Sequence, residues 1–197
     1  MKMSIYLLKP KFQLLLRPSV RYLAGKGVTA NQITILALVF TLVSSIILYM
    51  VELTVWWGFL PIILFVRMAL NAIDGMLARE HQMTSSLGFV LNEVCDLISD
   101  AAIYLSFLTI PGFNVYALFG FVLLAWLSEV IAILSQQTTQ KRANQGPMGK
   151  SDRAFLFGGL GLLVAAGVDF TSSGLWVLLL AGFALIITIY RRLQTIY

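Results

Sequence analysis

The stretch "NAIDGMLAREHQMTSSLGFVLNEVCD", residues 71–96, joins the end of one long apolar segment to the beginning of the next and places carboxylates and amides inside both. Its polar residues fall at helical spacing. One stripe is formed by Arg67, Asn71, Asp74 and Ala78, and a second by Gly88, Asn92, Asp96 and Asp100. Residues three or four positions apart share one face of a helix. We therefore expect two helices whose polar stripes face a common cavity.

The composition indicates a membrane protein. Of the 197 residues, 59% are hydrophobic and 12% are charged, which is far from the balance of a soluble domain. A helix needs about 20 apolar residues to cross about 30 Å of hydrocarbon. Six segments qualify, at residues 31–51, 55–77, 85–109, 115–137, 152–169 and 173–190. The prediction is an all-α, polytopic bundle of six transmembrane helices over residues 31–190, within a single membrane domain at 1–197.

Residues 1–27 are predicted to form an amphipathic helix that lies on the membrane surface. The apolar positions are Phe12, Leu15, Leu16, Val20 and Leu23, and the basic residues that lie largely on the rest of the helix are Lys9, Lys11, Arg17 and Arg21. A helix with this division binds an anionic lipid surface. An ordinary basic tail is the alternative interpretation.

The basic residues indicate the topology. Thirteen of the 14 Lys and Arg residues lie on one side of the predicted bundle, at the termini, in the loops at 78–84 and 138–151 or, for Arg153, at the start of the following span, and the exception is Arg67. The positive-inside rule then places both termini and these two loops in the cytoplasm. The net charge of +5 is thus explained by topology and does not indicate nucleic-acid binding. The predicted location is a bacterial-type cytoplasmic (inner) membrane.

The polar groups are expected to share one depth. At about 1.5 Å per helical residue, Asn71 and Asp74 lie roughly 24–28 Å from Val55, and Asp96 lies about 21 Å from Ile110. Glu129 lies about 21 Å from Val115 on the same count. Carboxylates inside a membrane normally face a bundle interior or a wet cavity. Oxygen ligands from two helices suit a hard divalent cation, and the alternative is hydrogen bonding that holds the bundle together.

Two further acidic residues of the 85–109 segment have separate interpretations. Asp100 either joins the polar stripe as an additional cation ligand or pairs with Arg67, which is expected at a similar depth. Glu93 is rotated about 100° away from the stripe and is expected to point toward neighbouring helices or the cytoplasmic loops.

Residues 71–96 resemble the motif of the CDP-alcohol phosphotransferase (phosphatidyltransferase) family. The motif reads Asp, two residues, Asp-Gly, two residues, Ala-Arg, eight residues, Gly, three residues, Asp, three residues, Asp. The spacing is intact, but asparagine stands at the first and third aspartate positions, Asn71 and Asn92. The stretch "VTANQIT", residues 28–34, is similar to the beginning of the family's first membrane span, with Ala30 in place of proline.

The resemblance implies a transferase in phospholipid biosynthesis. A CDP-alcohol, most simply CDP-diacylglycerol, would donate a phosphatidyl group to an acceptor hydroxyl, with release of CMP. In the family the four motif aspartates hold two divalent metals on the pyrophosphate of the donor. The implied cofactor is therefore Mg²⁺ or Mn²⁺, on ligands drawn from Asn71, Asp74, Asn92, Asp96 and Asp100. Asp96 would be the catalytic base, and the nucleotide would contact Asn31, Gly75, Ala78, Arg79 and Gly88. A homodimer is also implied.

The second basic motif is "GPMGKSDRA", residues 146–154. A turn followed by a helix, capped by Ser151 or Asp152, would place Lys150 and Arg153 beside a positive helix end. We expect these two residues to bind the acceptor or a phosphate. A plain helix cap in a cytoplasmic loop is the alternative.

Other functions are compatible with the same residues. A catalytically impaired family member would bind a CDP-lipid or a partner, and Asn71 and Asn92 are its main support. A small transporter with an acidic relay leaves the glycine spacing unexplained, and a purely structural membrane subunit does so too. The acceptor stays open between glycerol 3-phosphate, an inositol phosphate, serine and the hydroxyl of another lipid.

Overall fold

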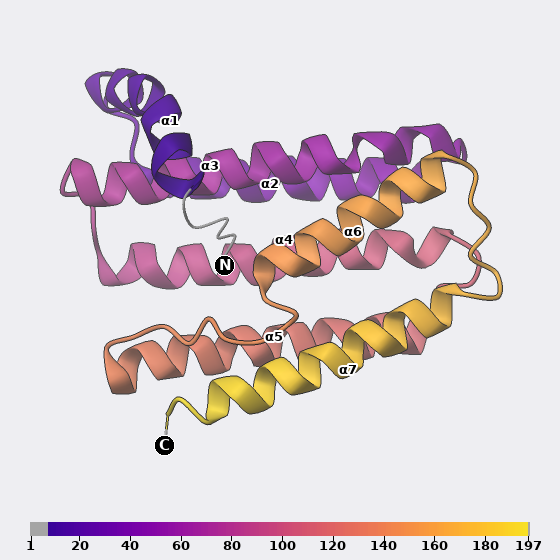
Figure 1. Ribbon diagram of the computed structural model, residues 1–197. Helices are drawn as coiled ribbons and strands as arrows, with labels where there is room; N and C mark the ends of the chain where they lie inside the picture. The colour runs from indigo at the N-terminus through magenta and orange to yellow at the C-terminus, as the bar shows by residue number, and fades with distance from the viewer. Residues whose placement is uncertain (1–7, 197) are drawn as a thin grey trace. The chain divides into compact units, whose positions relative to one another are not determined.

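The computed structural model describes residues 8–196, and the side chains of residues 12–196 (Figure 1). Lys2 and the side chains of Lys9 and Lys11 therefore lie outside the described part. The helices are α1 (Leu8–Gly25), α2 (Ala30–Met50), α3 (Leu60–Glu80), α4 (Ser86–Ser106), α5 (Val115–Thr139), α6 (Lys150–Ala165) and α7 (Gly174–Leu193), with the short 3-10 helices η2 (Thr54–Phe59) and η3 (Phe107–Thr109). No strand occurs among the described residues. The all-α prediction is confirmed.

Each of the six predicted apolar segments forms a helix, although several boundaries differ from the prediction by a few residues, and two of these differences are described here. Helix α3 continues to Glu80, so Ala78 and Arg79 lie on a helix and not in the predicted loop at 78–84. Helix α6 ends at Ala165, before the predicted end at residue 169. The cause at α6 is Gly167, whose φ of +82° is open to glycine and strained for other residues.

Four helical stretches are long and apolar enough to cross a membrane: Ala30–Met50, Thr54–Glu80, Val115–Thr139 and Gly174–Leu193. Helices α4 and α6 are not among them. Helix α4 carries three acidic residues, Glu93, Asp96 and Asp100, and α6 has 16 residues. The count of six spans therefore stays a prediction.

The chain forms two compact units. Unit 1 comprises residues 1–43 and 65–99, and unit 2 comprises residues 44–64 and 100–197. The boundaries fall inside α2, α3 and α4. The prediction of a single membrane domain is not tested by this division.

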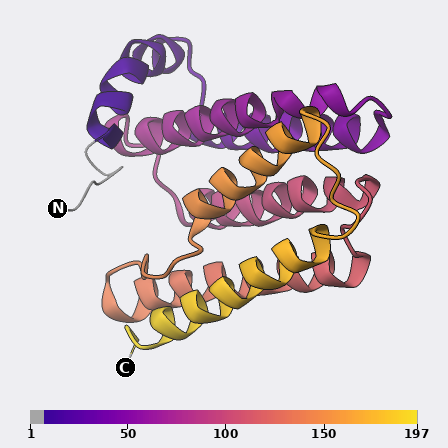
Figure 2. The same cartoon turned by 45° about the vertical axis from the view of Figure 1, so that its right-hand side comes forward.

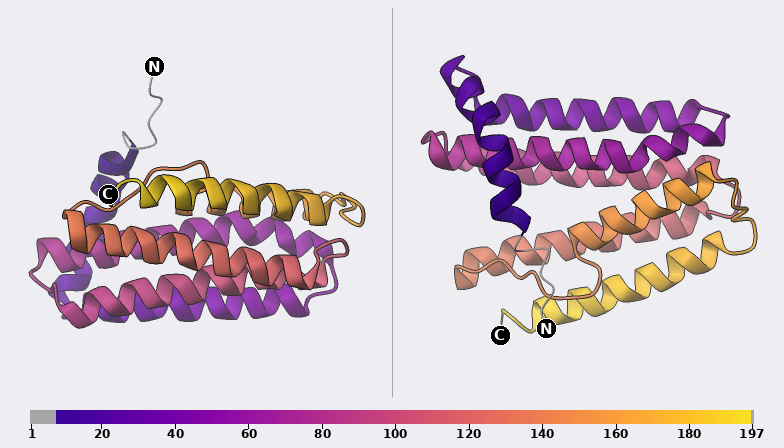
Figure 3. Two further views of the ribbon diagram at one scale, coloured as in Figure 1. Left: turned by 90° about the horizontal axis from the view of Figure 1, so that it is seen from below. Right: turned by 45° about the horizontal axis from the view of Figure 1, so that its top comes forward.

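The core of unit 1 holds α1 against α2 and α3. Its buried residues are Val20, Ala30, Ile33, Ile73, Met76 and Leu77. Helix α1 runs across these helices and not alongside them (Figure 3). Of the predicted apolar face, Val20 is fully buried and Leu16 and Leu23 pack on the core, whereas Leu15 is 73% exposed. The position of α1 at a membrane surface stays a prediction.

The core of unit 2 is rich in aromatic side chains. Tyr104, Phe107, Phe121 and Phe157 form ring contacts with centroids 4.3–5.4 Å apart. Helices α5 and α7 lie side by side (Figure 2). Helix α6 packs on η2 so closely that a Cβ atom at Gly161 would lie 2.9 Å from the backbone oxygen of Trp57. This contact requires glycine and fixes the beginning of the apolar segment that leads into α3.

Candidate active site

Asp74 is held by a hydroxyl from α2. Asp74 lies on α3 and is 5% exposed. Thr34 Oγ1 donates a hydrogen bond to Asp74 Oδ2 at 2.8 Å, and the same hydroxyl lies 3.2 Å from the Ala30 carbonyl. Thr34 is itself 5% exposed. The sequence interpretation did not include Thr34, although it lies in the quoted stretch "VTANQIT", one turn after Asn31.

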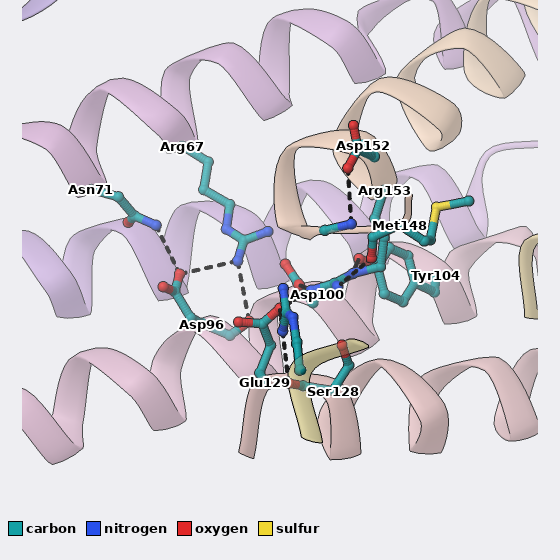
Figure 4. Close-up of polar contacts among 12 residues, drawn as sticks. Arg67, Asn71, Asp96, Asp100, Tyr104, Ser128, Glu129, Met148, Asp152 and Arg153 are labelled. Carbon is teal, nitrogen blue, oxygen red and sulfur yellow. Dashed lines mark hydrogen bonds and ion pairs between the residues drawn. The ribbon is translucent and has the colours of Figure 1, made fainter. Parts of the chain in front are cut away.

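Asp96 on α4 is held by two residues of α3 (Figure 4). Asn71 Nδ2 donates to Asp96 Oδ1 at 2.7 Å, and Arg67 Nη2 donates to the same oxygen at 3.2 Å. Arg67 Nη2 also reaches the backbone carbonyl of Asp96 at 3.1 Å. The predicted stripes of α3 and α4 therefore do face each other in unit 1. The predicted pair between Arg67 and Asp100 is not tested by these contacts and stays a prediction.

Two of the motif glycines are crowded by side chains predicted to bind the nucleotide. A Cβ atom at Gly88 would lie 2.9 Å from Asn31 Oδ1 and 3.0 Å from Ser85 Oγ. Ser85 Oγ accepts the backbone N–H of Gly88 at 2.9 Å, a bond that stabilises the first turn of α4. A Cβ atom at Gly75 would lie 3.0 Å from Arg79 Nη2. The structure thus brings Asn31 to Gly88 and Arg79 to Gly75.

The side chains at the remaining motif positions are half-buried. Ala78 is half-buried against the core of unit 1, and Asn92 is half-buried on α4. Glu93, next to Asn92, is 7% exposed. This burial agrees with the expectation that Glu93 points toward neighbouring helices or loops.

A second polar cluster lies in unit 2 and surrounds Glu129 of α5. Its carboxylate accepts Arg153 at 3.0 Å and Arg192 at 3.2 Å on Oε1, and Arg142 at 3.2 Å on Oε2. These arginines come from α6, from α7 and from the loop before α6. The sequence interpretation did not include Arg142 or Arg192 in any site, since both were assigned to topology.

Arg153, predicted to bind the acceptor or a phosphate, is fully buried. Its Nε donates to the Tyr104 hydroxyl at 3.0 Å, and its Nη2 donates to Asp100 Oδ2 at 3.2 Å as well as to Glu129. Nη1 reaches the Met148 carbonyl at 3.3 Å. A phosphate at Arg153 would have to displace these partners. The role predicted for Lys150 and Arg153 stays a prediction.

The predicted cap of α6 is supplied by Asp152. Its Oδ2 accepts the backbone N–H of Gly149 at 2.9 Å, and Lys150 is the first residue of the helix. An aspartate in the first turn also complements the positive end of the helix dipole. Helix α6 thus begins at Lys150 after the N-cap residue Gly149, earlier than a cap at Ser151 or Asp152 would place it, and Asp152 supplies its hydrogen bond from the first turn.

The donor set of unit 1 fits one divalent cation better than two. The motif supplies two carboxylates, Asp74 and Asp96, and Asp96 Oδ1 already accepts Asn71 and Arg67. Among the described residues, no group of three or more His, Cys, Asp or Glu side chains is placed to hold a metal ion. Mg²⁺ is commonly bound through one or two carboxylates together with substrate phosphates. Asp74 fits that description.

Solved structures share this fold. The phosphatidylinositol phosphate synthase PgsA1 of Mycobacterium tuberculosis superposes with a TM-score of 0.70 at 23% identity. One of its crystal structures contains manganese and citrate and spans 91% of this chain and 87% of that one. Another contains CDP-DAG and spans 91% and 92% of the two chains. At this identity the likeness shows the fold.

Related sequences agree with the fold. Inner membrane protein YnbA of Escherichia coli K12 is 45% identical over 163 residues, which are 83% of this chain and 81% of YnbA. Archaetidylinositol phosphate synthase of Pyrococcus horikoshii is 36% identical over 96 residues, about half of each chain at 49%. Together with the four candidate spans, these relatives identify an integral membrane protein. The family model for CDP-alcohol phosphatidyltransferase matches residues 27–190, and the chain therefore belongs to the CDP-alcohol phosphatidyltransferase family.

Proposed function

We propose that this protein transfers a phosphatidyl group from a CDP-diacylglycerol-type donor to an acceptor hydroxyl and releases CMP. The observation that carries the proposal is that hydrogen bonds hold both motif carboxylates of unit 1, Asp74 through Thr34 on α2 and Asp96 through Asn71 on α3. Membership of the family supports it, as does the CDP-DAG bound to the mycobacterial synthase of the same fold. The intact spacing of the motif around Gly75, Arg79 and Gly88 supports it as well.

In this reaction the acceptor oxygen attacks the phosphorus that carries diacylglycerol, and the bond from that phosphorus to the CMP oxygen breaks. Asp96 takes the proton of the acceptor hydroxyl. Asp74 would hold Mg²⁺ or Mn²⁺, which when bound supplies positive charge to the pyrophosphate and to the leaving CMP. Thr34 orients the Asp74 carboxylate through its 2.8 Å hydrogen bond.

The nucleotide is assigned to the surface around Gly75 and Gly88. Glycine leaves room for a ligand to approach the backbone of a helix closely, and Asn31 and Arg79 already lie at these two positions. Arg79 is exposed, so its guanidinium is able to turn toward a phosphate. Ala78 completes the proposed nucleotide contacts, and Asn71 and Asn92 lie on the same stripes as the two carboxylates.

The orientation in the membrane is part of the proposal. Six spans, cytoplasmic termini and a site that opens to the cytoplasm would let a lipid donor enter sideways and a soluble acceptor enter from water. A homodimer, implied by the family, is proposed with it. A reporter fused after Tyr197 should be active only in the cytoplasm. Activity of that fusion on the outer side of the membrane would contradict the topology.

The experiment that tests the function is CMP release from CDP-diacylglycerol by the purified protein in a bilayer, with Mg²⁺ or Mn²⁺. The acceptors are glycerol 3-phosphate, an inositol phosphate, serine and a lipid hydroxyl, and mass spectrometry identifies the lipid product. A reaction without acceptor measures hydrolysis of the donor. Acceptor-dependent CMP release that is lost in Asp74→Asn and Asp96→Asn supports the proposal.

A second candidate is a catalytically impaired member that binds a CDP-lipid. It is favoured by the contact between Asn71 and Asp96, because a hydrogen bond stands where the family has two aspartates. The outcome that favours it is saturable binding of the donor without CMP release for any acceptor, together with release after Asn71→Asp and Asn92→Asp. CMP release by the wild type would exclude it.

A further inference from the structure

One carboxylate oxygen in unit 1 has two cationic or polar donors from the same helix. Asp96 Oδ1 lies 2.7 Å from Asn71 Nδ2 and 3.2 Å from Arg67 Nη2, and Arg67 also holds the backbone carbonyl of Asp96. The Arg67 side chain is 7% exposed and that of Asp96 is 16% exposed. A bond between charged groups in such a poorly hydrated site is strong and its geometry is well defined.

The direction of the Asn71 amide follows from the chemistry of its partner. An ionised carboxylate only accepts hydrogen bonds, so Asn71 must present its NH₂ group to Asp96. A cation bound to that same carboxylate oxygen would require acceptor atoms around it, and the NH₂ group is not one. An aspartate at position 71 would instead face Asp96 with a second negative charge and would need a cation between them.

The charges of the site lead to the same result. Asp74 and Asp96 carry a formal charge of −2 where the four aspartates of the family motif carry −4, and the Arg67 guanidinium paired with Asp96 brings the charge of this set to −1. Two divalent cations would neutralise four aspartates, but would leave this set with a large positive excess. One divalent cation leaves an excess of a single charge, which the pyrophosphate of the donor then neutralises.

We propose that Arg67 and Asn71 occupy, with their guanidinium and amide groups, the place of one of the family's two divalent cations at Asp96, so that this chain binds a single divalent cation through Asp74. The proposal rests on the proposed function. Arg67 and Asn71 are positioning residues that fix the Asp96 carboxylate before any ligand arrives. The single cation takes its other ligands from the pyrophosphate of the nucleotide.

The decisive measurement is the number of Mn²⁺ ions bound per chain of the wild-type protein in nanodiscs. CDP serves as the pyrophosphate-containing probe, and the bound ion is counted by electron paramagnetic resonance. The proposal expects one ion per chain at saturation with CDP, and weak binding without it. Two ions per chain would overturn the proposal and would leave the transferase function intact.

A variant tests the cause of this stoichiometry. The triple substitution Arg67→Gln/Asn71→Asp/Asn92→Asp removes the guanidinium and restores the family's four carboxylates. It should bind two Mn²⁺ ions, with an affinity at least about tenfold higher without nucleotide because three negative charge units are gained near the ions. Thermal unfolding with and without Mn²⁺ gives a second readout, since a bound ion stabilises the folded state.

The matched control changes the net charge by the same amount outside the motif. Arg17→Gln/Asn114→Asp/Asn144→Asp removes one exposed ion-pair partner of Glu80 and adds two carboxylates, one of them at the N-cap of α5, where aspartate caps as well as asparagine. It should keep one ion per chain. Two ions in this control would assign the effect to net charge and overturn the proposal.

The remaining outcomes separate this proposal from the proposed function. One ion with acceptor-dependent CMP release supports both. One ion with CDP binding but without CMP release supports the single-cation site and contradicts the transferase. No ion in the presence of CDP contradicts both. If the triple variant does not fold, the ion count of the wild type still decides the proposal.

Discussion

Asp96 on α4 and Glu129 on α5 are both carboxylates on helices of 21 and 25 residues, but the structure holds them in different ways. Asp96 accepts one guanidinium and one neutral amide, and its side chain is 16% exposed. Glu129 accepts three guanidiniums, one of which, that of Arg153, is fully buried. A neutral amide partner and partial exposure leave Asp96 able to exchange a contact with a ligand. Glu129 instead ties α5 to α6, α7 and the loop between α5 and α6.

The difference indicates two uses of a carboxylate in the helices of this protein, one that holds helices together and one that is proposed for chemistry. Breaking a buried ion pair leaves an uncompensated charge, which costs about 3–5 kcal/mol. Around Glu129 that cost would fall on three arginines, so the cluster is expected to stabilise the arrangement of unit 2. Only one guanidinium pairs with Asp96 in these contacts. We therefore expect a substitution of Asp96 to reduce catalytic activity more than stability.

The largest expected effect is on turnover. Asp74→Asn and Asp96→Asn should each reduce CMP release by at least about 100-fold, because each removes a charge that acts in the transition state. The measurement is acceptor-dependent CMP release per folded protein. The control is Asp169→Asn, an exposed residue after α6 whose contact is with Thr171. If Asp96→Asn kept an activity close to that of the control, the contrast between Asp96 and Glu129 would be lost. The same result for Asp74→Asn would contradict the proposed role of Asp74.

The next effect concerns stability. Glu129→Gln should lower the free energy of unfolding by about 3–5 kcal/mol, because three guanidiniums lose their common carboxylate. Thermal unfolding in detergent measures it, with the exposed Glu52→Gln as control. The folded fraction of Glu129→Gln should keep the specific activity of the wild type. A loss of activity without a loss of stability would place Glu129 in the chemistry and remove the contrast.

A double-mutant cycle sharpens the assignment of Arg67. Arg67→Met and Asp96→Asn should be coupled by about 1–3 kcal/mol in unfolding free energy, since the two side chains form a poorly exposed ion pair. The Arg67/Asp100 cycle tests the pair expected from the sequence, and the Arg153/Asp100 cycle tests the contact seen in unit 2. Additive losses for Arg67 and Asp96 would contradict the contact on which the single-cation site depends.

The smallest effect concerns the glycines. Gly88→Ala should raise the KM for CDP-diacylglycerol by about three- to tenfold, roughly 1 kcal/mol, because its Cβ would meet Asn31 at 2.9 Å. Gly120→Ala on α5 is the matched control, since nothing lies within 4 Å of a Cβ there. It should leave KM unchanged and stabilise its helix by up to about 1 kcal/mol. Equal effects on KM would argue against a nucleotide at Gly88.

Much of the site could be expected from spacing alone. The positions of Asn71 and Asp74 on one face of α3, and of Gly88, Asn92 and Asp96 along α4, follow from the helical repeat. The contacts between these faces agree with the expectation that the two stripes face each other, and the common cavity stays a prediction. The partners were harder to predict. Thr34 comes from a separate helix, and no local pattern in the sequence connects it to a carboxylate 40 residues later.

The arginines show the same limit of local patterns. Arg142 and Arg192 were interpreted only through the positive-inside rule, which depends on the number of positive charges in a loop and not on their contacts. Their convergence on Glu129 depends on how α5, α6 and α7 pack in unit 2. The burial of Arg153 among Tyr104, Asp100 and Glu129 likewise depends on packing, and its place in a helix-capping motif did not indicate it.

By itself the sequence determined the helices, the class of membrane protein, the family motif and its two asparagines, because hydrophobicity and helical period are properties of neighbouring residues. The tertiary structure decided which donor each carboxylate receives. It gave Asp74 a hydroxyl, Asp96 an amide and one guanidinium, and Glu129 three guanidiniums. The physical reason is that a hydrogen bond or ion pair requires two atoms about 3 Å apart, and for residues far apart in the chain that distance is set by packing.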